Sequence, residues 1–499
     1  MTGDKGRGVL VAPGAAAGVA TMSSRSRGIV GVLSKRGALV VALVGLAARF
    51  AVVAWAARSI PPSADGTYYD TLAVRLAEGH GYTWLWPDGA VTYAAHYPVG
   101  YPAILALGYA LSGARPVIAM SINALIGAAG AVATRSLVAR ASTPRLALGA
   151  GLAVALHPVL VPYTAALMTE GVTASLLVIA AALAARAREA ERPFRWVALS
   201  GLVMGVATLV RPQSLALAPV LGWLALSDSG ATAPTSRRPV ARPPLAWRAP
   251  LATALLTATA LGVCAPWTVR NCWRMERCSL VSVNGGWNLA IGTQTDTGGW
   301  QEIAVPDTCR TVFQEAAKDE CFGREAKRVI AAAPIRWLRR APAKLRMTFD
   351  YFGAAPWYLH TANAERFPYD AKVMLGAIET LASRLLLLGA LVTLLRMRVV
   401  PEPRLPWLRR GLALVGLVAC VLVAGTVGYL ALALGILALG WRALNRAPLV
   451  ASFSAAVILA TAMTHAVFFG SGRYGIVVVP FVTALAFVRA PFGTLRARS

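Results

Sequence analysis

An acid directly after the first long apolar segment is the group in this sequence best placed to do chemistry. Residues 37–57 are apolar and long enough to cross the roughly 30 Å hydrocarbon core of a bilayer, and Asp65 follows a few residues later, with Tyr68 and Tyr69 next to it. A carboxylate held at the membrane surface can accept a proton from a hydroxyl and so act as a general base. The alternative is a solvated loop acid without a catalytic role.

Other polar side chains lie at the ends of later apolar segments, where an ionisable group tends to face a cavity or a partner. They are Glu170, Arg211, Arg270 with Asn271, and Arg473 with Tyr474. Guanidinium groups bind phosphate oxygens through paired hydrogen bonds, and a carboxylate beside them can take a proton. Any one of these arginines could instead extend its charged end to the membrane surface. Three arginines and two carboxylates on one face together indicate a site for a phosphorylated substrate.

The composition places the chain among polytopic membrane proteins. Hydrophobic residues make up 57% of the 499 positions and charged residues 14%, and the mean hydropathy is +0.58. A soluble fold would have too little polar surface to cover itself. The net charge of +27 does not indicate nucleic-acid binding, because the arginines gather in short segments between apolar runs, as cytoplasmic loops of membrane proteins do.

The basic clusters set the predicted path of the chain. They lie at 25–36, 135–145, 186–195, 237–248, 396–410, 442–446 and 489–499. When every cluster is placed in the cytoplasm, about twelve spans result, and Asp65 lies on the external face of a multi-pass protein of the cytoplasmic (inner) membrane. The predicted spans are 37–57, 116–137, 146–161, 172–185, 197–210, 215–226, 250–267, 375–395, a hairpin within 411–441, 450–469 and 476–488.

This topology divides the chain into four regions. Residues 1–36 form a disordered cytoplasmic N-terminus, with either Met1 or Met22 as the true start. Residues 37–270 form a transmembrane catalytic module with a first external loop at 58–113, residues 271–372 a large external segment, and residues 373–499 the C-terminal transmembrane helices.

Four cysteines lie in the external segment, where oxidation to disulfides is expected. On loop-closure grounds we favour pairing Cys272 with Cys278 and Cys309 with Cys321, although four cysteines permit other pairings. A zinc site is the alternative, but the segment has no CxxC pair and no histidine between Cys272 and Cys321. The tryptophans of NGGWNLAIGTQTDTGGW in the same segment could stack on a sugar or anchor the loop at the membrane surface.

The ordered motifs resemble a known family. They are ADGTYYDTLAVRLAEGHGY, HYPVGYPAILAL, PYTAALMTEG, GLVMGVATLVRP, APWTVRN, NGGWNLAIGT and HAVFFGSGRYGIVVVP. In this order they are similar to the bacterial glycosyltransferase family 39 branch of the GT-C superfamily, whose members include dolichyl-phosphate-mannose protein mannosyltransferases and lipid A aminoarabinose transferases. The resemblance covers residues 37–489. It implies an all-α GT-C architecture and inverting transfer of a sugar from a polyprenyl phosphate carrier to an external hydroxyl, with Asp65 at the position of the family's first-loop acid.

The sequence also departs from this family. Gly66 stands where many relatives have Glu after the first-loop Asp, which weakens a metal-binding interpretation of that pair. Tyr97 precedes Pro98 where aminoarabinose transferases have Lys, which argues against that specificity. Glu170 resembles the family's second-loop acid, so a divalent cation between Asp65 and Glu170 stays open; no other cofactor is indicated.

The predicted enzyme uses Asp65 as the general base. Arg211, Arg270 and Arg473 would stabilise the departing phosphate, while His96, Tyr97 and Tyr474 line the sugar pocket and Tyr68, Tyr69, Glu170 and Asn271 complete the substrate site. Its partners would be a polyprenyl phosphate sugar, an envelope glycolipid, glycan or protein acceptor, and membrane lipids. The sequence does not identify the sugar or the acceptor. A transporter or flippase for a lipid-linked sugar is the alternative from another class, and a non-catalytic relative that only binds such a lipid is a third.

Overall fold

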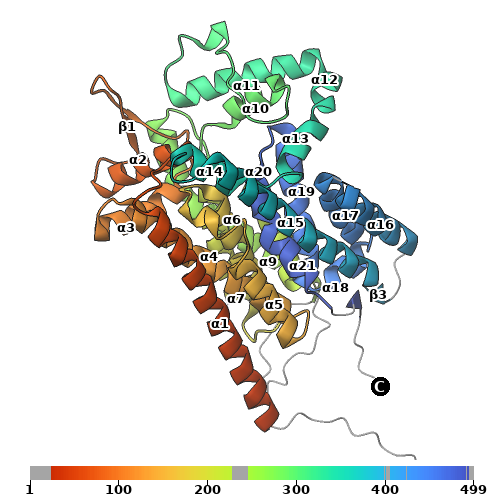
Figure 1. Ribbon diagram of the computed structural model, residues 1–499. Coiled ribbons are helices and arrows are strands. Elements are labelled where there is room, and N and C mark those ends of the chain that lie inside the picture. Colours follow the sequence, from red (N-terminus) through yellow and green to blue (C-terminus); the bar gives the residue numbers. More distant parts are fainter. Residues whose placement is uncertain are drawn as a thin grey trace, which may run out of the picture.

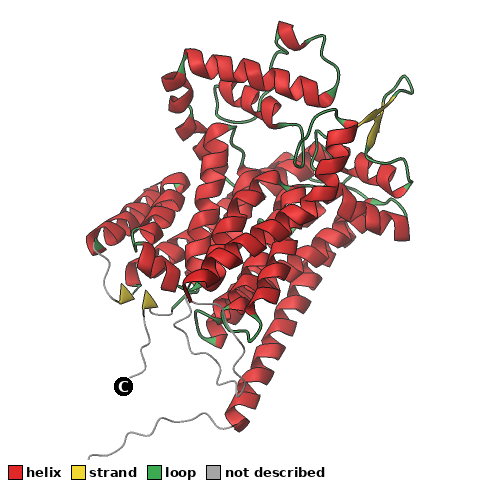
Figure 2. Cartoon of the chain, turned by 180° about the vertical axis from the view of Figure 1, so that it is seen from behind, coloured by secondary structure: helices red, strands yellow, loops and turns green. Residues whose placement is uncertain are grey.

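The computed structural model describes residues 24–227, 245–397, 399–400, 405–422, 424–489 and 492–493. Long helices form a bundle, and a smaller layer of helices and loops covers one end of it (Figure 1). The back view shows the same arrangement, with a short two-stranded hairpin projecting at the edge of this layer (Figure 2).

Seven helices in the described part of the chain are long and apolar enough to cross a membrane. They are α1 (Ser24–Ala56), α4 (Pro116–Ala139), α6 (Thr169–Ala187), α7 (Pro193–Val210), α9 (Leu245–Arg274), α15 (Tyr369–Arg396) and α19 (Leu449–Val467). The all-α polytopic class is therefore confirmed. The count of about twelve spans stays a prediction, because the remaining apolar helices are individually shorter than any of these seven.

Shorter apolar helices occupy the other predicted spans. They are α5 (Pro144–Ala155), α8 (Ala218–Leu226) after the 3-10 turn Pro212–Leu217, α16 (Pro406–Leu422), α17 (Gly425–Leu437), and α20 (Gly472–Gly475) with α21 (Val479–Ala486), which are joined by the 3-10 turn Ile476–Val478. The predicted hairpin within 411–441 is present, because α16 and α17 are separate helices packed side by side. Val421 and Leu422 of α16 are 72% and 67% exposed, as expected of side chains that face lipid.

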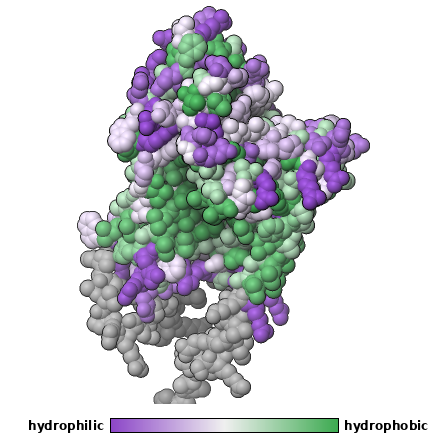
Figure 3. Space-filling view, turned by 90° about the vertical axis from the view of Figure 1, so that its left-hand side faces the viewer, coloured by the Kyte–Doolittle hydropathy of each residue, from purple (hydrophilic) through white to green (hydrophobic). Residues whose placement is uncertain are grey.

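The surface is divided as a membrane protein requires. Hydrophobic residues dominate the middle and lower part of the face in Figure 3, and hydrophilic residues gather at the top and at the lower edge. Contacts at the lower end join loops that are far apart in sequence: the Arg188 guanidinium donates to the Ala447 carbonyl (2.8 Å), and the Arg489 amide donates to the Ala141 carbonyl (3.3 Å). Several predicted cytoplasmic clusters thus lie at one end of the bundle.

The first external loop begins with α2 (Asp65–Ala77) and ends with α3 (Gly100–Ser112). Between them, strands β1 (Thr83–Leu85) and β2 (Val91–Tyr93) pair antiparallel, with Trp84 opposite Thr92. The loop lies at the end of the bundle opposite the basic clusters.

The external segment is a compact helical layer. It contains α10 (Gly285–Gln294), the 3-10 turn Asp307–Cys309, α11 (Glu315–Ala332), α12 (Pro334–Arg339), α13 (Ala341–Phe349) and α14 (Ala354–Ala362). Its small hydrophobic core joins Ile291 and Phe322 to Phe469, which follows α19, and to Tyr474 of α20. The layer is therefore packed onto the chain next to Arg473.

The remaining elements are short: the 3-10 turn Pro162–Ala165, α18 (Trp441–Arg446), and strands β3 (Val399–Val400) and β4 (Phe492–Gly493), which pair in parallel. We predict a disordered N-terminus up to residue 36. This boundary is wrong, since α1 already begins at Ser24, before the apolar stretch at 37–57. Residues 1–23 lie outside the described residues, as does most of the basic cluster at 237–248.

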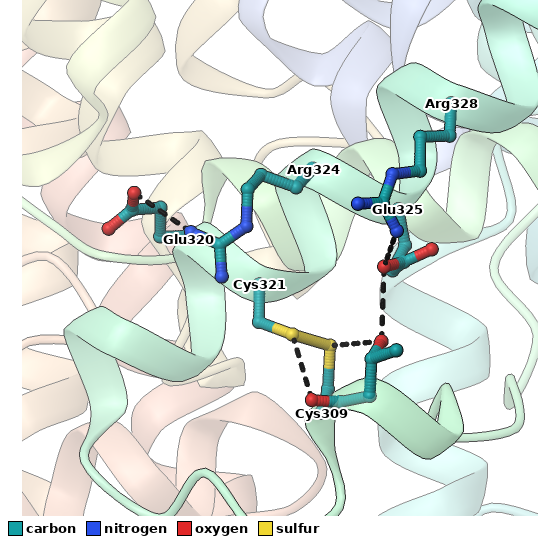
Figure 4. The surroundings of a disulfide bond; sticks show 7 residues. Cys309, Glu320, Cys321, Arg324, Glu325 and Arg328 are labelled. Carbon is teal, nitrogen blue, oxygen red and sulfur yellow. Dashed lines mark hydrogen bonds and ion pairs between the residues drawn. A yellow bond between two sulfur atoms is a disulfide. The ribbon is translucent and has the colours of Figure 1, made fainter.

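Both predicted disulfides are present, Cys272–Cys278 and Cys309–Cys321. Figure 4 shows the second bond at α11, next to the ion pairs Glu320–Arg324 (2.9 Å) and Glu325–Arg328 (2.7 Å) on the same helix. The bond attaches the turn before α11 to the helix itself, so it stabilises the outer part of the layer.

Thiol labelling tests this pairing. In purified protein denatured without reductant, we expect only Cys264 and Cys420 to react, because these are the cysteines without a disulfide partner. After reduction all 6 cysteines should react. Intact-mass measurement counts the labels, and labelling of Cys309 or Cys321 before reduction would contradict the assignment.

Candidate active site

Asp65 is the first residue of α2, and the backbone that leads into it is fixed from two sides. The hydroxyl oxygen of Tyr358 in α14 accepts hydrogen bonds from the Ser63 amide (3.1 Å) and the Leu167 amide (3.3 Å). Ala64 has a φ of 51°, a conformation that costs on the order of 1–3 kcal/mol for a residue with a side chain. The hydrogen bonds to Tyr358 hold this strained backbone at Ala64 in place, because they attach the first external loop to the loop before α6.

Gly66 has a steric reason in this arrangement. A Cβ atom on Gly66 would lie 2.7 Å from the Tyr358 hydroxyl oxygen and 3.0 Å from the Leu167 carbonyl oxygen. A side chain there would displace the Tyr358 hydroxyl, so a second carboxylate next to Asp65 would disturb the contact that holds this backbone. The departure from the family pattern is thus coupled to the contact that holds Asp65 in place.

Asp65 forms an ion pair with Arg473, its partner from the other end of the sequence. The Arg473 Nη1 atom lies 2.7 Å from Asp65 Oδ2, and the Tyr97 hydroxyl donates to Asp65 Oδ1 (3.3 Å). Burial raises the pKa of the Asp65 carboxyl. The charge of Arg473 and the hydrogen bonds from Arg473 and the Tyr97 hydroxyl lower this pKa by more than burial raises it, so it lies below its ordinary value. Asp65 is therefore a carboxylate at neutral pH, and 31% of its side chain stays exposed.

Glu170 is the second acid of the cluster and is almost completely buried. Its Oε1 atom lies 2.7 Å from Arg211 Nη1 and 3.6 Å from Arg473 Nε, and its Oε2 atom accepts from the Tyr163 hydroxyl (2.8 Å). Arg473 thus lies between the two carboxylates. Both guanidinium groups also lie over the Tyr474 ring, at 5.0 Å from its centroid. We call Asp65, Glu170, Arg211 and Arg473 the charge cluster.

A cavity of about 450 Å³ opens onto the charge cluster. Its lining includes many of the site residues predicted from the sequence: Asp65, Tyr69, His96, Tyr97, Glu170, Arg211, Arg473 and Tyr474. Trp287 and Trp300, from the segment with the predicted sugar-stacking tryptophans, line the same cavity. The polar groups and aromatic rings around this space suit a sugar, which presents both hydroxyls and an apolar face.

A second cavity of about 590 Å³ adjoins the first and is mainly apolar. It is lined by Tyr68, Met347, Trp357 and Tyr358, and also by Lys372. Both cavities share Asp65, Trp300, Phe469 and Arg473. The acid and its arginine therefore stand where a polar space and an apolar space meet.

Arg270 and Asn271 are not at this site. The Arg270 guanidinium donates to the carbonyls of Ala94 and Tyr82 (both 2.8 Å) and lies over the Trp267 ring (4.6 Å). The Asn271 amide donates to the Ser279 carbonyl (3.1 Å). Neither residue lines either of the two cavities, so both hold loop backbone in place, which the sequence pattern alone did not distinguish from phosphate binding.

The loop with His96 and Tyr97 is held by Glu315, a residue that sequence reasoning missed. Its carboxylate accepts from the amides of Ala95 (2.6 Å) and His96 (2.9 Å) and from the Trp84 indole (2.6 Å). Burial lowers the pKa of His96 below its ordinary value, although nearby acids oppose this effect. Glu315 lies more than 200 residues along the chain from this loop, so no local motif could have revealed the contact.

The cluster does not suit a cation bridged between Asp65 and Glu170, because the guanidinium of Arg473 already lies between these carboxylates. In the described part of the chain, no group of three or more His, Cys, Asp or Glu side chains is arranged to hold a metal ion.

Comparison with known proteins agrees with the predicted family. Residues 96–263 match the family described as dolichyl-phosphate-mannose-protein mannosyltransferase. The predicted resemblance is confirmed for these residues. The matched stretch contains His96, Tyr97, Glu170 and Arg211, whereas Asp65 and Arg473 lie on either side of it. The chain matches no curated protein sequence.

Two kinds of solved structure are similar to this chain. The AglB oligosaccharyltransferase from Archaeoglobus fulgidus, in complex with an inhibitory peptide and a dolichol-phosphate, is 13% identical with a TM-score of 0.43, over 91% of this chain and 50% of that chain. ArnT from Cupriavidus metallidurans bound to undecaprenyl phosphate is 17% identical with a TM-score of 0.35, over 93% and 78% of the two chains. The chain thus spans about half the length of the archaeal enzyme.

The burial of the charge cluster predicts its contribution to stability. Glu170→Gln should lower the stability by roughly 3 kcal/mol, because removing one partner of a buried ion pair leaves Arg211 without its counter-charge. Thermal unfolding in detergent measures this loss. The control is Glu189→Gln, whose exposed pair with Arg140 should contribute no more than about 1 kcal/mol. Equal effects of the two substitutions would contradict the assignment.

Proposed function

We propose that this protein is a membrane glycosyltransferase that moves a sugar from a polyprenyl phosphate carrier to a hydroxyl acceptor. One observation carries the proposal: a carboxylate and its partner arginine, Asp65 and Arg473, stand at the junction of a polar and an apolar cavity. This transfer requires a base for the hydroxyl, a cation for the phosphate and an apolar path for the lipid, and all three meet at this junction.

The two cavities divide the substrate between them in this proposal. The apolar cavity with Trp357 and Met347 takes the first part of the polyprenyl chain, and the polar cavity takes the sugar and the acceptor. Arg473 lines both spaces, so its guanidinium can reach a phosphate that links lipid to sugar. Trp287 and Trp300 offer ring faces to the sugar.

The reaction then needs one proton transfer and one displacement. The acceptor hydroxyl oxygen attacks the anomeric carbon, its proton passes to the Asp65 carboxylate, and the bond between the anomeric carbon and the phosphate oxygen breaks. The electron pair of that bond stays on the phosphate, whose charge Arg473 stabilises. Attack opposite the leaving phosphate inverts the configuration at the anomeric carbon.

Arg473 has two tasks in this scheme. Before the donor binds, it pairs with Asp65 and keeps it ionised. A donor phosphate competes for the same guanidinium, and the carboxylate that loses part of its partner becomes a stronger base. The ion pair between Arg211 and Glu170 remains in place, so the charge of Glu170 stays balanced while Arg473 interacts with both Asp65 and the phosphate. The active site lies on the external face in the predicted topology.

The first test is Asp65→Asn. Asn retains the shape and a hydrogen-bonding oxygen but cannot accept the proton, so transfer should fall by about a hundredfold to ten-thousandfold. Mass spectrometry of envelope glycolipids and exported proteins, from cells with the wild-type or the variant gene, identifies the modification and measures its loss. The control is Asp70→Asn on the same helix, because Asp70 binds the Tyr109 hydroxyl and lines neither cavity.

Wild-type modification in the Asp65→Asn cells would reject Asp65 as the base. A gene-dependent lipid-linked sugar that changes sides of the membrane without being transferred would favour the flippase or transporter instead.

The second test is the pH profile of Arg473→Gln. In the wild type Arg473 lowers the pKa of Asp65, so we expect kcat/KM to hold down to an acid limb below the ordinary aspartate pKa of about 3.9. Without the arginine the pKa rises, and the acid limb should move to higher pH. Binding of undecaprenyl phosphate should also weaken by roughly 1.5–3 kcal/mol.

The control is Arg274→Gln, since Arg274 is an exposed external arginine that stacks on Tyr93. It should change neither the pH profile nor the binding. An acid limb that stays in place in Arg473→Gln would contradict the pairing of Arg473 with the catalytic acid.

A further inference from the structure

Lys344 of α13 is a fully buried lysine that the proposed chemistry does not use. Its side chain is 0% exposed, and lysine is almost never fully buried without a partner. Its Nζ atom donates to the carbonyls of Val467 (3.0 Å) and Ala466 (3.3 Å) and lies 5.5 Å from the centre of the Trp337 ring. Burial and the neighbouring Arg340 lower its pKa to about 8, so keeping the ammonium in this position costs free energy.

The two carbonyls that Lys344 binds are the last of α19. The final carbonyls of a helix have no partner within the helix and lie at the negative end of its dipole. The Lys344 ammonium donates hydrogen bonds to these carbonyls and places a positive charge at the negative end of the helix dipole. The segment 468–475 leaves α19 directly from this point and carries Arg473 and Tyr474 to the charge cluster.

The same segment is confined on two further sides. The Gly470 amide donates to the Gly298 carbonyl (2.8 Å) in the external segment. A Cβ atom on Gly470 would lie 1.9 Å from the Lys344 carbonyl oxygen, so the two backbones are in direct contact. A shift of the Lys344 backbone would therefore push directly on this segment.

We propose that Lys344 is a positioning residue for Arg473, because it fixes the direction in which the segment 468–475 leaves α19. Through Lys344 the external segment sets the place of the phosphate-binding guanidinium. The effect on donor binding rests on the proposed function, whereas the hold on the segment itself does not. Lys344 lines neither of the two cavities, so it acts through Arg473 rather than on the substrate.

Three variants separate positioning from general stability. Lys344→Met keeps most of the length of the side chain but removes the donor and the charge. Lys344→Arg keeps the charge and the donors. Lys344→Gln removes the charge and shortens the side chain, and it serves if the methionine variant does not fold. Lys327→Met is the control, because Lys327 is an exposed lysine of α11 in the same layer.

Hydrogen exchange provides the readout that is independent of activity. In Lys344→Met we expect the amides in 468–475 to exchange about tenfold faster than in the wild type, while those of α6 stay unchanged. Lys344→Gln should give the same result if it is the variant that folds. Lys344→Arg should retain the protection of the wild type. Binding of undecaprenyl phosphate to the protein in nanodiscs should weaken by about tenfold in Lys344→Met and recover in Lys344→Arg. Lys327→Met should match the wild type in both measurements.

Unchanged exchange of 468–475 in the folded Met or Gln variant would overturn the proposal, as would faster exchange spread evenly over α6 and this segment. Failure of Lys344→Arg to restore protection would also overturn it. If undecaprenyl phosphate does not bind even the wild type, the proposed function fails, and the exchange data still decide whether Lys344 positions the segment.

Discussion

A charged group next to a membrane must be paired, and this constraint organises the whole site. Asp65 and Glu170 would each be costly near the end of a helical bundle without a cation. Arg473 pairs with both, and Arg211 completes the balance on Glu170. Because these side chains come from four separate parts of the chain, the bundle must bring those parts together before any of the charges is satisfied.

The external layer supplies the contacts that hold these parts. Tyr358 fixes the backbone before Asp65, Glu315 fixes the loop with His96 and Tyr97, and Lys344 fixes the end of the helix before Arg473. Each of these three residues belongs to the segment between two long helices and lies far from its partner in sequence. The layer is thus part of the site and more than a cover over it.

Two cavities meet at the ion pair of Asp65 and Arg473, and the proposed chemistry depends on this arrangement. An arginine that already neutralises a carboxylate adds no net charge to the empty pocket, yet it can be shared with an incoming phosphate. When it is shared, the acid loses part of the interaction that lowers its pKa. In the proposed reaction, donor binding and activation of the base are therefore coupled through a single side chain.

The sequence determined the features that depend on local pattern. Apolar length and arginine spacing predicted the helices, and the short separation of the cysteines predicted both disulfides. Motif order predicted the family resemblance, and the topology set by the basic clusters placed Asp65, Glu170, Arg211 and Arg473 on one face. Only the tertiary structure decided which charges meet. Arg270 and Arg473 look alike at the ends of their helices, but one faces backbone carbonyls and the other faces Asp65. Such pairings depend on distances across the fold, which neither hydropathy nor spacing encodes.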